Sequence, residues 1–167
     1  MAIRYNEEIA RYLKKYIPGF ENAYFDRVAP FMGVRETRRL VGEYVLTEQD
    51  IFDCARFDDS IAVSAYPVDL HHPVGGDCTL MWCPDCHDIP YRSLLPKNID
   101  SLIVAGRCIS ATHLALASVR VMGPAMATGE AAGKAAALSV KHNVQLRDLD
   151  VAALQTALRE EGVYLRD

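Results

Sequence analysis

The sequence lacks the features that several classes of protein require. It has no block of basic residues, and its formal net charge is −4, so the positive surface that nucleic-acid binding needs is missing. No apolar run is long enough to span a membrane, and the N-terminus has no apolar secretion segment. Five cysteines, an odd number, without such a signal predict reduced thiols. We therefore expect a cytoplasmic protein that binds neither nucleic acid nor a membrane.

The amino-acid composition is that of a globular protein. Hydrophobic residues make up 50% of the 167 positions and charged residues 24%, which is too apolar for a disordered chain. A chain of this length buries enough surface for one core. We expect a single domain.

Periodicity and capping residues predict a mixed α+β fold, with a β-rich segment at 34–82 packed against an Ala-rich helix. Residues 69–78 read as a long loop, because Pro and Gly interrupt them. The predicted helices are 6–16, 21–28, 47–54, 124–142 and 150–160, and the predicted strands are 34–46, 61–66, 79–82 and 102–105.

The Ala-rich helix begins in an unusual way. Gly123 and Pro124 offer no side chain to cap it, so its first N–H groups remain available to an external acceptor, such as a flavin carbonyl that gains negative charge on reduction. A plain helix buried through its small residues is the alternative interpretation. The small residues form one stripe along it: Ala125, Gly129, Ala132, Gly133 and Ala136.

Two long segments resemble a known family. Residues 89–138 read IPYRSLLPKNIDSLIVAGRCISATHLALASVRVMGPAMATGEAAGKAAAL, and residues 33–51 read GVRETRRLVGEYVLTEQDI. The first resembles the C-terminal segment of FAD-dependent oxidoreductases related to fumarate reductase flavoproteins and heterodisulfide-reductase-like proteins. The second is similar to the substrate-domain segment of the same family. The resemblance implies an oxidoreductase that transfers a hydride between FAD and a small, anionic organic substrate.

The resemblance also implies roles for individual residues. Gly106 and Arg107 would lie along the ribityl and pyrophosphate part of FAD, and backbone groups of the next helix would contact the pyrimidine edge. A cationic cluster in the other segment would orient a substrate carboxylate. The implied cofactor-binding residues are Gly106, Arg107, Ser110, Met122, Gly123 and Met126, and the implied catalytic residues are His113, Arg120 and Arg38, the last together with Arg35 and Arg39.

Each of the catalytic assignments has a simpler alternative. Arg38 and Arg39 could be solvated, or paired with Glu36 and Glu43. His113 could be a half-buried histidine with a hydrogen-bond partner rather than a group that transfers a proton.

One departure from the family pattern matters for function. Family members hold the FAD pyrophosphate with a GxGxxG turn, whereas the ten glycines here include no GxG. We therefore expect a C-terminal part of a flavoprotein, with residues 1–90 resembling the substrate domain and 91–167 completing the FAD domain. It would be inactive alone and would need the N-terminal half or a partner subunit. Exposed apolar surface could also produce a homodimer. The alternative is a non-catalytic subunit or interaction module.

The cysteine-rich loop leaves several interpretations open. Cys83 to His87 spell CxxCH, the covalent haem-attachment signal, which the lack of an export signal disfavours. The two cysteines could be a redox-active dithiol or simply reduced thiols in a loop. A metal-binding module would draw on Cys78, Cys83, Cys86 and His87, with His71 or His72.

Overall fold

The computed structural model describes residues 2–31, 33–71 and 78–166. The chain divides into two compact units, Met1–Val34 and Arg35–Asp167. The first unit contains helix α1 (Ala2–Tyr16), which confirms the predicted helix and begins four residues earlier than residue 6. After α1 the backbone turns at Gly19, whose φ of +93° lies in the left-handed region that glycine adopts without strain.

The second helix predicted in this unit, 21–28, is wrong. Both carboxylate oxygens of Glu21 accept hydrogen bonds from the Gly19 N–H, at 3.1 and 3.0 Å, so this side chain stabilises a turn instead. Tyr24 and Phe25 are 85% and 46% exposed. A short helix gains most of its stability by burying an apolar face, and this segment buries none.

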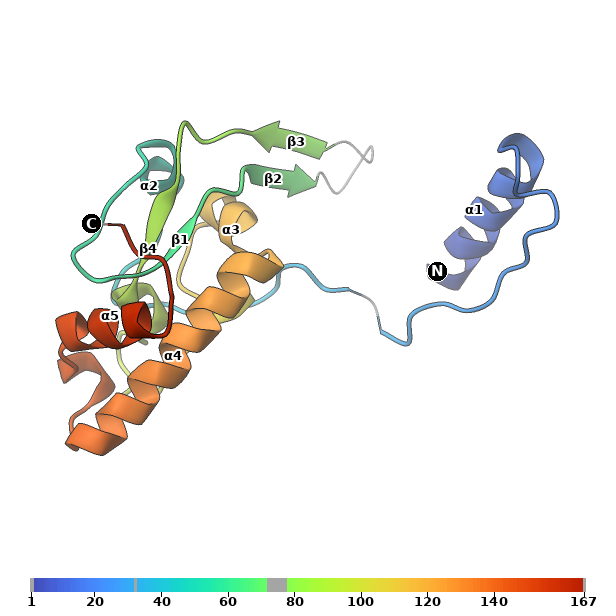
Figure 1. Cartoon of the computed structure of the whole chain (residues 1–167). Coiled ribbons are helices and arrows are strands. Elements are labelled where there is room, and N and C mark those ends of the chain that lie inside the picture. Colours follow the sequence, from blue (N-terminus) through green and yellow to red (C-terminus); the bar gives the residue numbers. More distant parts are fainter. Residues whose placement is uncertain (1, 32, 72–77, 167) are drawn as a thin grey trace. The chain divides into compact units, whose positions relative to one another are not determined.

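The second unit has the predicted mixed α+β composition. Its described part forms two small antiparallel sheets and four α-helices, together with three short 3-10 helices (Figure 1). In chain order the elements are α2 (Glu48–Phe52), β1 (Ser60–Ser64), β2 (Val68–His71), β3 (Cys78–Met81), β4 (His87–Pro90), η1 (Tyr91–Leu94), η2 (Gly106–Cys108), α3 (His113–Val119), α4 (Met122–His142), η3 (Leu146–Asp148) and α5 (Val151–Glu160).

The two sheets are each a pair of strands. β1 pairs with β4, with Ser64 opposite His87, and β2 pairs with β3, with His71 opposite Cys78. The predicted strands 61–66 and 79–82 correspond to β1 and β3. The predicted loop 69–78 is partly wrong, because Asp69–His71 belong to β2; residues 72–77 lie outside the described part. β4 was not predicted.

The strand predicted at 34–46 is also wrong, although much of its backbone is extended. Its N–H groups bond to scattered carbonyls: Leu40 to Cys108 at 2.8 Å and Leu46 to Ser110 at 3.0 Å. Only isolated bridges form, at Gly42 and Leu46. An alternating sequence favours extended backbone, but a ladder also needs a strand alongside it.

The strand predicted at 102–105 is wrong for the same reason. In the described residues it joins no sheet; the Val104 N–H donates to the Leu94 carbonyl at 2.9 Å. Leu102 is 43% exposed. This apolar segment therefore runs along the unit without a neighbouring strand.

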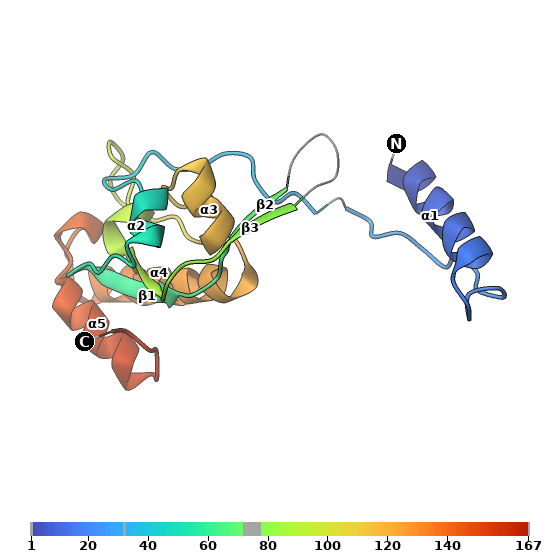
Figure 2. The same cartoon turned by 90° about the horizontal axis from the view of Figure 1, so that it is seen from above.

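Helices cover the sheets of the second unit. α4 contacts both β1 and α5, and α3 contacts β2 (Figures 1 and 2). The core between them contains fully buried aliphatic side chains, including Leu46, Ile51, Ile61, Leu116 and Leu154. Burial of these side chains drives the packing.

The long helix α4 packs through a face different from its stripe of small residues. Its buried residues are Pro124, Thr128, Ala131, Ala132 and Ala135. Of the stripe only Ala132 is buried, whereas Gly129 and Gly133 are exposed, with no heavy atom within 4 Å of where a Cβ would lie. The stripe is therefore open at its two glycines.

Candidate functional site

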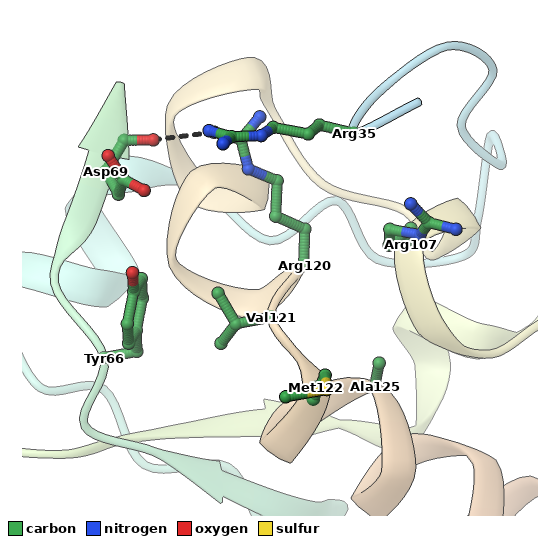
Figure 3. A pocket seen from close by; sticks show the side chains of 8 residues that line it. All are labelled: Arg35, Tyr66, Asp69, Arg107, Arg120, Val121, Met122 and Ala125. Atoms are coloured by element: carbon green, nitrogen blue, oxygen red, sulfur yellow. Dashed lines mark hydrogen bonds between the residues drawn. The ribbon is translucent and has the colours of Figure 1, made fainter. Parts of the chain in front are cut away.

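A cavity of about 590 Å³ lies where α3 gives way to α4. Three arginines from distant parts of the second unit line it: Arg35 before the core, Arg107 in η2 and Arg120 at the end of α3 (Figure 3). The other lining residues are Tyr66, Asp69, Val121, Met122 and Ala125. Three guanidinium groups and one carboxylate line the cavity, and this excess of positive charge favours a negatively charged ligand.

The corner between the two helices positions Arg120. Thr112 caps α3, accepting a hydrogen bond from the Ala115 N–H. Arg120 still has helical backbone angles, and Val121 is extended and becomes the N-cap of α4. A junction of two residues leaves Arg120 no freedom of placement, so its side chain starts from a fixed point at the cavity wall.

The guanidinium of Arg120 is held from two sides. It donates a hydrogen bond of 2.8 Å to the Asp69 carbonyl on β2, drawn as a dashed line in Figure 3. Its Nη1 lies 3.7 Å from a carboxylate oxygen of Glu36. The side chain is 10% exposed. A guanidinium fixed in this way has little rotamer freedom left to lose.

Glu36 connects several of the predicted residues. Its carboxylate contacts Nδ1 of His113 at 2.8 Å and forms an ion pair with Arg39, besides its contact with Arg120. Glu36 was expected only as a partner of Arg38 and Arg39. His113 and Arg120 are seven residues apart, hence on one helical face, and that spacing is the signal that could have indicated a shared partner.

The start of α4 has the bare N-terminus that the sequence predicts. No side chain caps it, and the helix begins at Met122, two residues before Pro124. Proline at the third helical position has no N–H, so the free donors of the first turn include those of Met122 and Gly123. Met122 and Met126 are 82% and 74% exposed. This turn presents backbone donors beside an apolar surface.

The AGR turn is tied to that same helix. Gly106 has a φ of +73°, which a residue with a Cβ adopts only with strain. Its N–H donates to the hydroxyl of Thr128 at 3.0 Å, and Thr128 in turn donates to the Pro124 carbonyl. Arg107 therefore follows a backbone that is fixed against α4.

A second, more apolar cavity of about 640 Å³ adjoins the first and shares Tyr66 and Val121 with it. Trp82, 73% exposed, and Leu80, 51% exposed, form part of its wall. The start of α4 thus separates an arginine-rich hollow from an apolar one. The remaining lining residues are Val63, Ser64, Ala65, Pro67, Gly123 and Pro124.

A model of the FAD dependent oxidoreductase family matches residues 2–158. The chain belongs to this family. The match covers nearly the whole sequence, in agreement with the expectation from the two segments that resemble it. No curated protein and no solved structure matches the chain significantly.

The predicted site residues of this family member fall into two groups. Arg107, Arg120 and Met122 line the arginine cavity and Gly123 lines the apolar one. Gly106 and Met126 lie next to these residues, and His113 is linked to Arg120 through Glu36. Tyr66 and Asp69 line the cavity but were not predicted as site residues.

Ser110 and Arg38 lie apart from both cavities. Ser110 is fully buried, and its hydroxyl accepts a hydrogen bond of 3.0 Å from the Gly42 N–H, so it serves the packing of this chain. Arg38 is exposed. Their roles toward cofactor and substrate stay predictions.

The cysteine-rich segment is spread over several places. In the part of the chain that the structure describes, the group of potential metal ligands whose atoms lie within 4.8 Å of one another is Asp69, His71 and Cys78. Cys83 contacts the Tyr66 carbonyl through sulfur at 3.8 Å. His87 is fully buried in β4. The predicted set of Cys78, Cys83, Cys86 and His87 is therefore not assembled here, and His72 lies outside the described residues.

The hairpin of β2 and β3 carries perturbed acid–base groups. The Cys78 thiol donates to an Asp69 carboxylate oxygen at 2.9 Å. This hydrogen bond lowers the pKa of Asp69, with His71 adding to the effect, and the same bond raises the pKa of Cys78.

Among the described residues no helix is long and apolar enough to cross a membrane.

Proposed function

We propose that this chain forms the flavin-facing and substrate-facing part of an FAD-dependent oxidoreductase that transfers a hydride between flavin and a small anionic organic substrate. One observation carries the proposal: Arg35, Arg107 and Arg120 line a single cavity beside an uncapped helix start. Guanidinium groups and the positive end of a helix dipole both favour negative charge. Family membership makes FAD the cofactor to test against this geometry.

The start of α4 fits the ring end of FAD. The N–H groups of Met122 and Gly123 would bind the pyrimidine edge, and an added Cβ at Gly123 would meet no heavy atom within 4 Å, so a flat ring has room to approach. The adjoining apolar cavity would take the hydrophobic part of the ring. Bound FAD supplies the hydride chemistry. The chain has no GxG turn that could hold the phosphates. Arg107 is therefore the residue of this chain that would face them.

The residues around Glu36 would bind and orient the substrate. Arg120, held by the Asp69 carbonyl and Glu36, would bind a substrate carboxylate in a fixed direction. The Nδ1 atom of His113 contacts Glu36, so Nε2 is the atom that would give or accept a proton. His113 is 63% exposed and is not among the residues that line the cavity, so the proposed proton transfer would take place outside it.

We also propose that another polypeptide segment completes the site, either an N-terminal FAD-binding half or a partner subunit. Three surfaces of the second unit support this. Residues 102–105 have no neighbouring strand in the described part, Gly129 and Gly133 form an open stripe on α4, and Val140 on the same helix is 83% exposed. Exposed apolar residues and unpaired backbone of this kind are features that an interface would cover. Alone, the chain would bind FAD weakly and be inactive, and it would act in the cytoplasm.

A non-catalytic interaction module is the second candidate function. The apolar face of α1 favours it, because Tyr5, Ile9, Tyr12 and Tyr16 are each more than half exposed. A homodimer formed through such surfaces would serve the same role.

Reconstitution separates the two candidates. The chain is mixed with its candidate FAD-binding half, and the flavin absorbance band of the complex is measured after gel filtration. A stable band supports the flavoenzyme, and a complex that never acquires one supports the interaction module. Sedimentation of the chain alone as a clean monomer at high concentration would count against a missing interface.

The arginine cavity is tested in that reconstituted complex. Arg120→Met should weaken the binding of a small dicarboxylate about 10- to 100-fold, the equivalent of about 1.5–3 kcal/mol for a charge-assisted hydrogen bond. Arg159→Met, at an exposed position on α5, is the matched control and should change nothing. Equal affinities in the two variants would mean that the anion binds elsewhere.

A further inference from the structure

We propose that Asp69, His71 and Cys78 form a binding site for a divalent transition metal, with Zn²⁺ as the best-suited ion. The three side chains come from one hairpin. Asp69 and His71 are two residues apart on β2, hence on one face of the strand, and Cys78 is paired directly opposite His71 on β3. Their ligand atoms all lie within 4.8 Å of one another.

The separations suit a tetrahedral ion. The Asp69 carboxylate lies 3.1 Å from Nε2 of His71 and 2.9 Å from Sγ of Cys78. With metal–ligand bonds of about 2.0–2.3 Å, the ligands of a tetrahedral zinc lie about 3.2–3.8 Å apart. The Asp69 oxygen needs to move away from each of the other two ligand atoms by only a few tenths of an ångström, and those two atoms lie within 4.8 Å of each other. An ion would then replace the thiol proton that now bridges Cys78 and Asp69.

The donor set also indicates the kind of metal. One sulfur, one imidazole nitrogen and one carboxylate oxygen are ligands that zinc accepts together, whereas calcium and magnesium prefer oxygen alone. A thiolate and a carboxylate together carry two negative charges, which balance the charge of the ion. Three protein ligands leave a fourth position for water.

The surroundings hold the site in place and limit its affinity. Arg120 donates a hydrogen bond to the Asp69 carbonyl, and the positive charge of Arg35 favours the thiolate form of Cys78. These cations oppose a free divalent ion. Cys78 is exposed, and the His71 side chain is 43% exposed. An open site beside two arginines is expected to exchange its metal, unlike a buried structural zinc.

The test is titration of the purified full chain with Co²⁺, followed by competition with Zn²⁺. Cobalt in place of zinc reports a thiolate ligand through a charge-transfer absorption in the near ultraviolet. We expect one Co²⁺ per chain with this absorption, its absence in Cys78→Ser, and an affinity at least about tenfold lower in His71→Gln. Cys108→Ser, which alters another exposed cysteine, should leave binding unchanged.

Each contrary result overturns the proposal. These are no cobalt absorption in the wild-type chain, an absorption that persists in Cys78→Ser, or one that disappears instead in Cys83→Ser or Cys86→Ser, which would assign the metal to the CxxCH segment. Circular dichroism confirms that the variants are folded. All three ligands belong to this chain, so a failed flavin reconstitution would not affect the result.

Discussion

Burial of His87 makes a specific prediction about how stability depends on pH. The side chain is fully buried in β4, and in the described part of the chain neither ring nitrogen has a hydrogen-bond partner. Desolvation, with a smaller contribution from Arg166, lowers its pKa from 6.5 to about 4. The folded protein therefore holds the imidazole neutral at a pH where the unfolded chain would protonate it.

The sign and size of the effect follow from linkage. At a pH well above 6.5 the ring is neutral in both states and contributes no pH dependence. As the pH falls toward 4, the unfolded chain binds a proton that the folded chain does not, so the free energy of unfolding decreases. The total loss is about 3 kcal/mol, of which about 2 kcal/mol falls between pH 7 and pH 5. Below the folded pKa both states are protonated and the loss stops.

The perturbation is His87→Leu, and the assay is urea unfolding at a series of pH values. The variant should lose about 2 kcal/mol less than the wild type between about pH 7 and pH 5. At neutral pH it should be as stable or more stable, because it removes two unpaired buried nitrogens that cost about 1–3 kcal/mol. Carboxylates contribute equally to both proteins and cancel in the difference.

His142→Gln is the control, since His142 is exposed at the end of α4, and its pH profile should follow that of the wild type. The reasoning is refuted if His87→Leu keeps the full slope. A loss of more than about 2 kcal/mol at pH 7 would refute it too, because it would mean that the imidazole has a stabilising partner.

Two further predictions concern stability, and urea unfolding at neutral pH checks both. Arg166→Met should lower the free energy of unfolding by about 3–5 kcal/mol. It removes the guanidinium that lies 2.7 Å from Asp88, and so leaves a carboxylate that is 4% exposed without its ion-pair partner. Adding Asp88→Asn to that variant should recover part of the loss, and no recovery would argue against the ion pair as the cause. Gly42→Ala should cost about 2–3 kcal/mol, the upper part of the range for overpacking, because its Cβ would lie 2.6 Å from that of Ser110. The control Ser110→Ala removes only the hydrogen bond to the Gly42 N–H and should cost about 1 kcal/mol; equal losses would mean that crowding at Gly42 is relieved elsewhere.

Helices whose capping residues lie next to their first turn could be predicted from the sequence. Thr47 and Asp50 form a reciprocal capping box at α2, and Asp150 accepts the first N–H groups of α5. The uncapped start of α4 was equally visible from Gly123 and Pro124. All these interactions span at most four residues, so the sequence around each helix end contains both partners.

Segments that depend on distant partners were not predictable in the same way. Residues 34–46 alternate as a strand does, yet their N–H groups bond to carbonyls as far away as Cys108 and Ser110. The helix expected at 21–28 failed because its own unit gives Tyr24 and Phe25 no apolar surface to pack against. In both cases the local preference was outweighed by what the rest of the chain provides.

The sequence by itself indicated the FAD-dependent oxidoreductase family and the mixed α+β class, and it proposed candidate site residues, because long motifs and capping patterns are local. Only the tertiary structure decided which of those residues meet. Glu36 reaches His113 across 77 positions, Ser110 turns into the core, and Asp69 joins His71 and Cys78 on one hairpin face. Such contacts depend on how the whole unit packs, and no local window of sequence contains both partners.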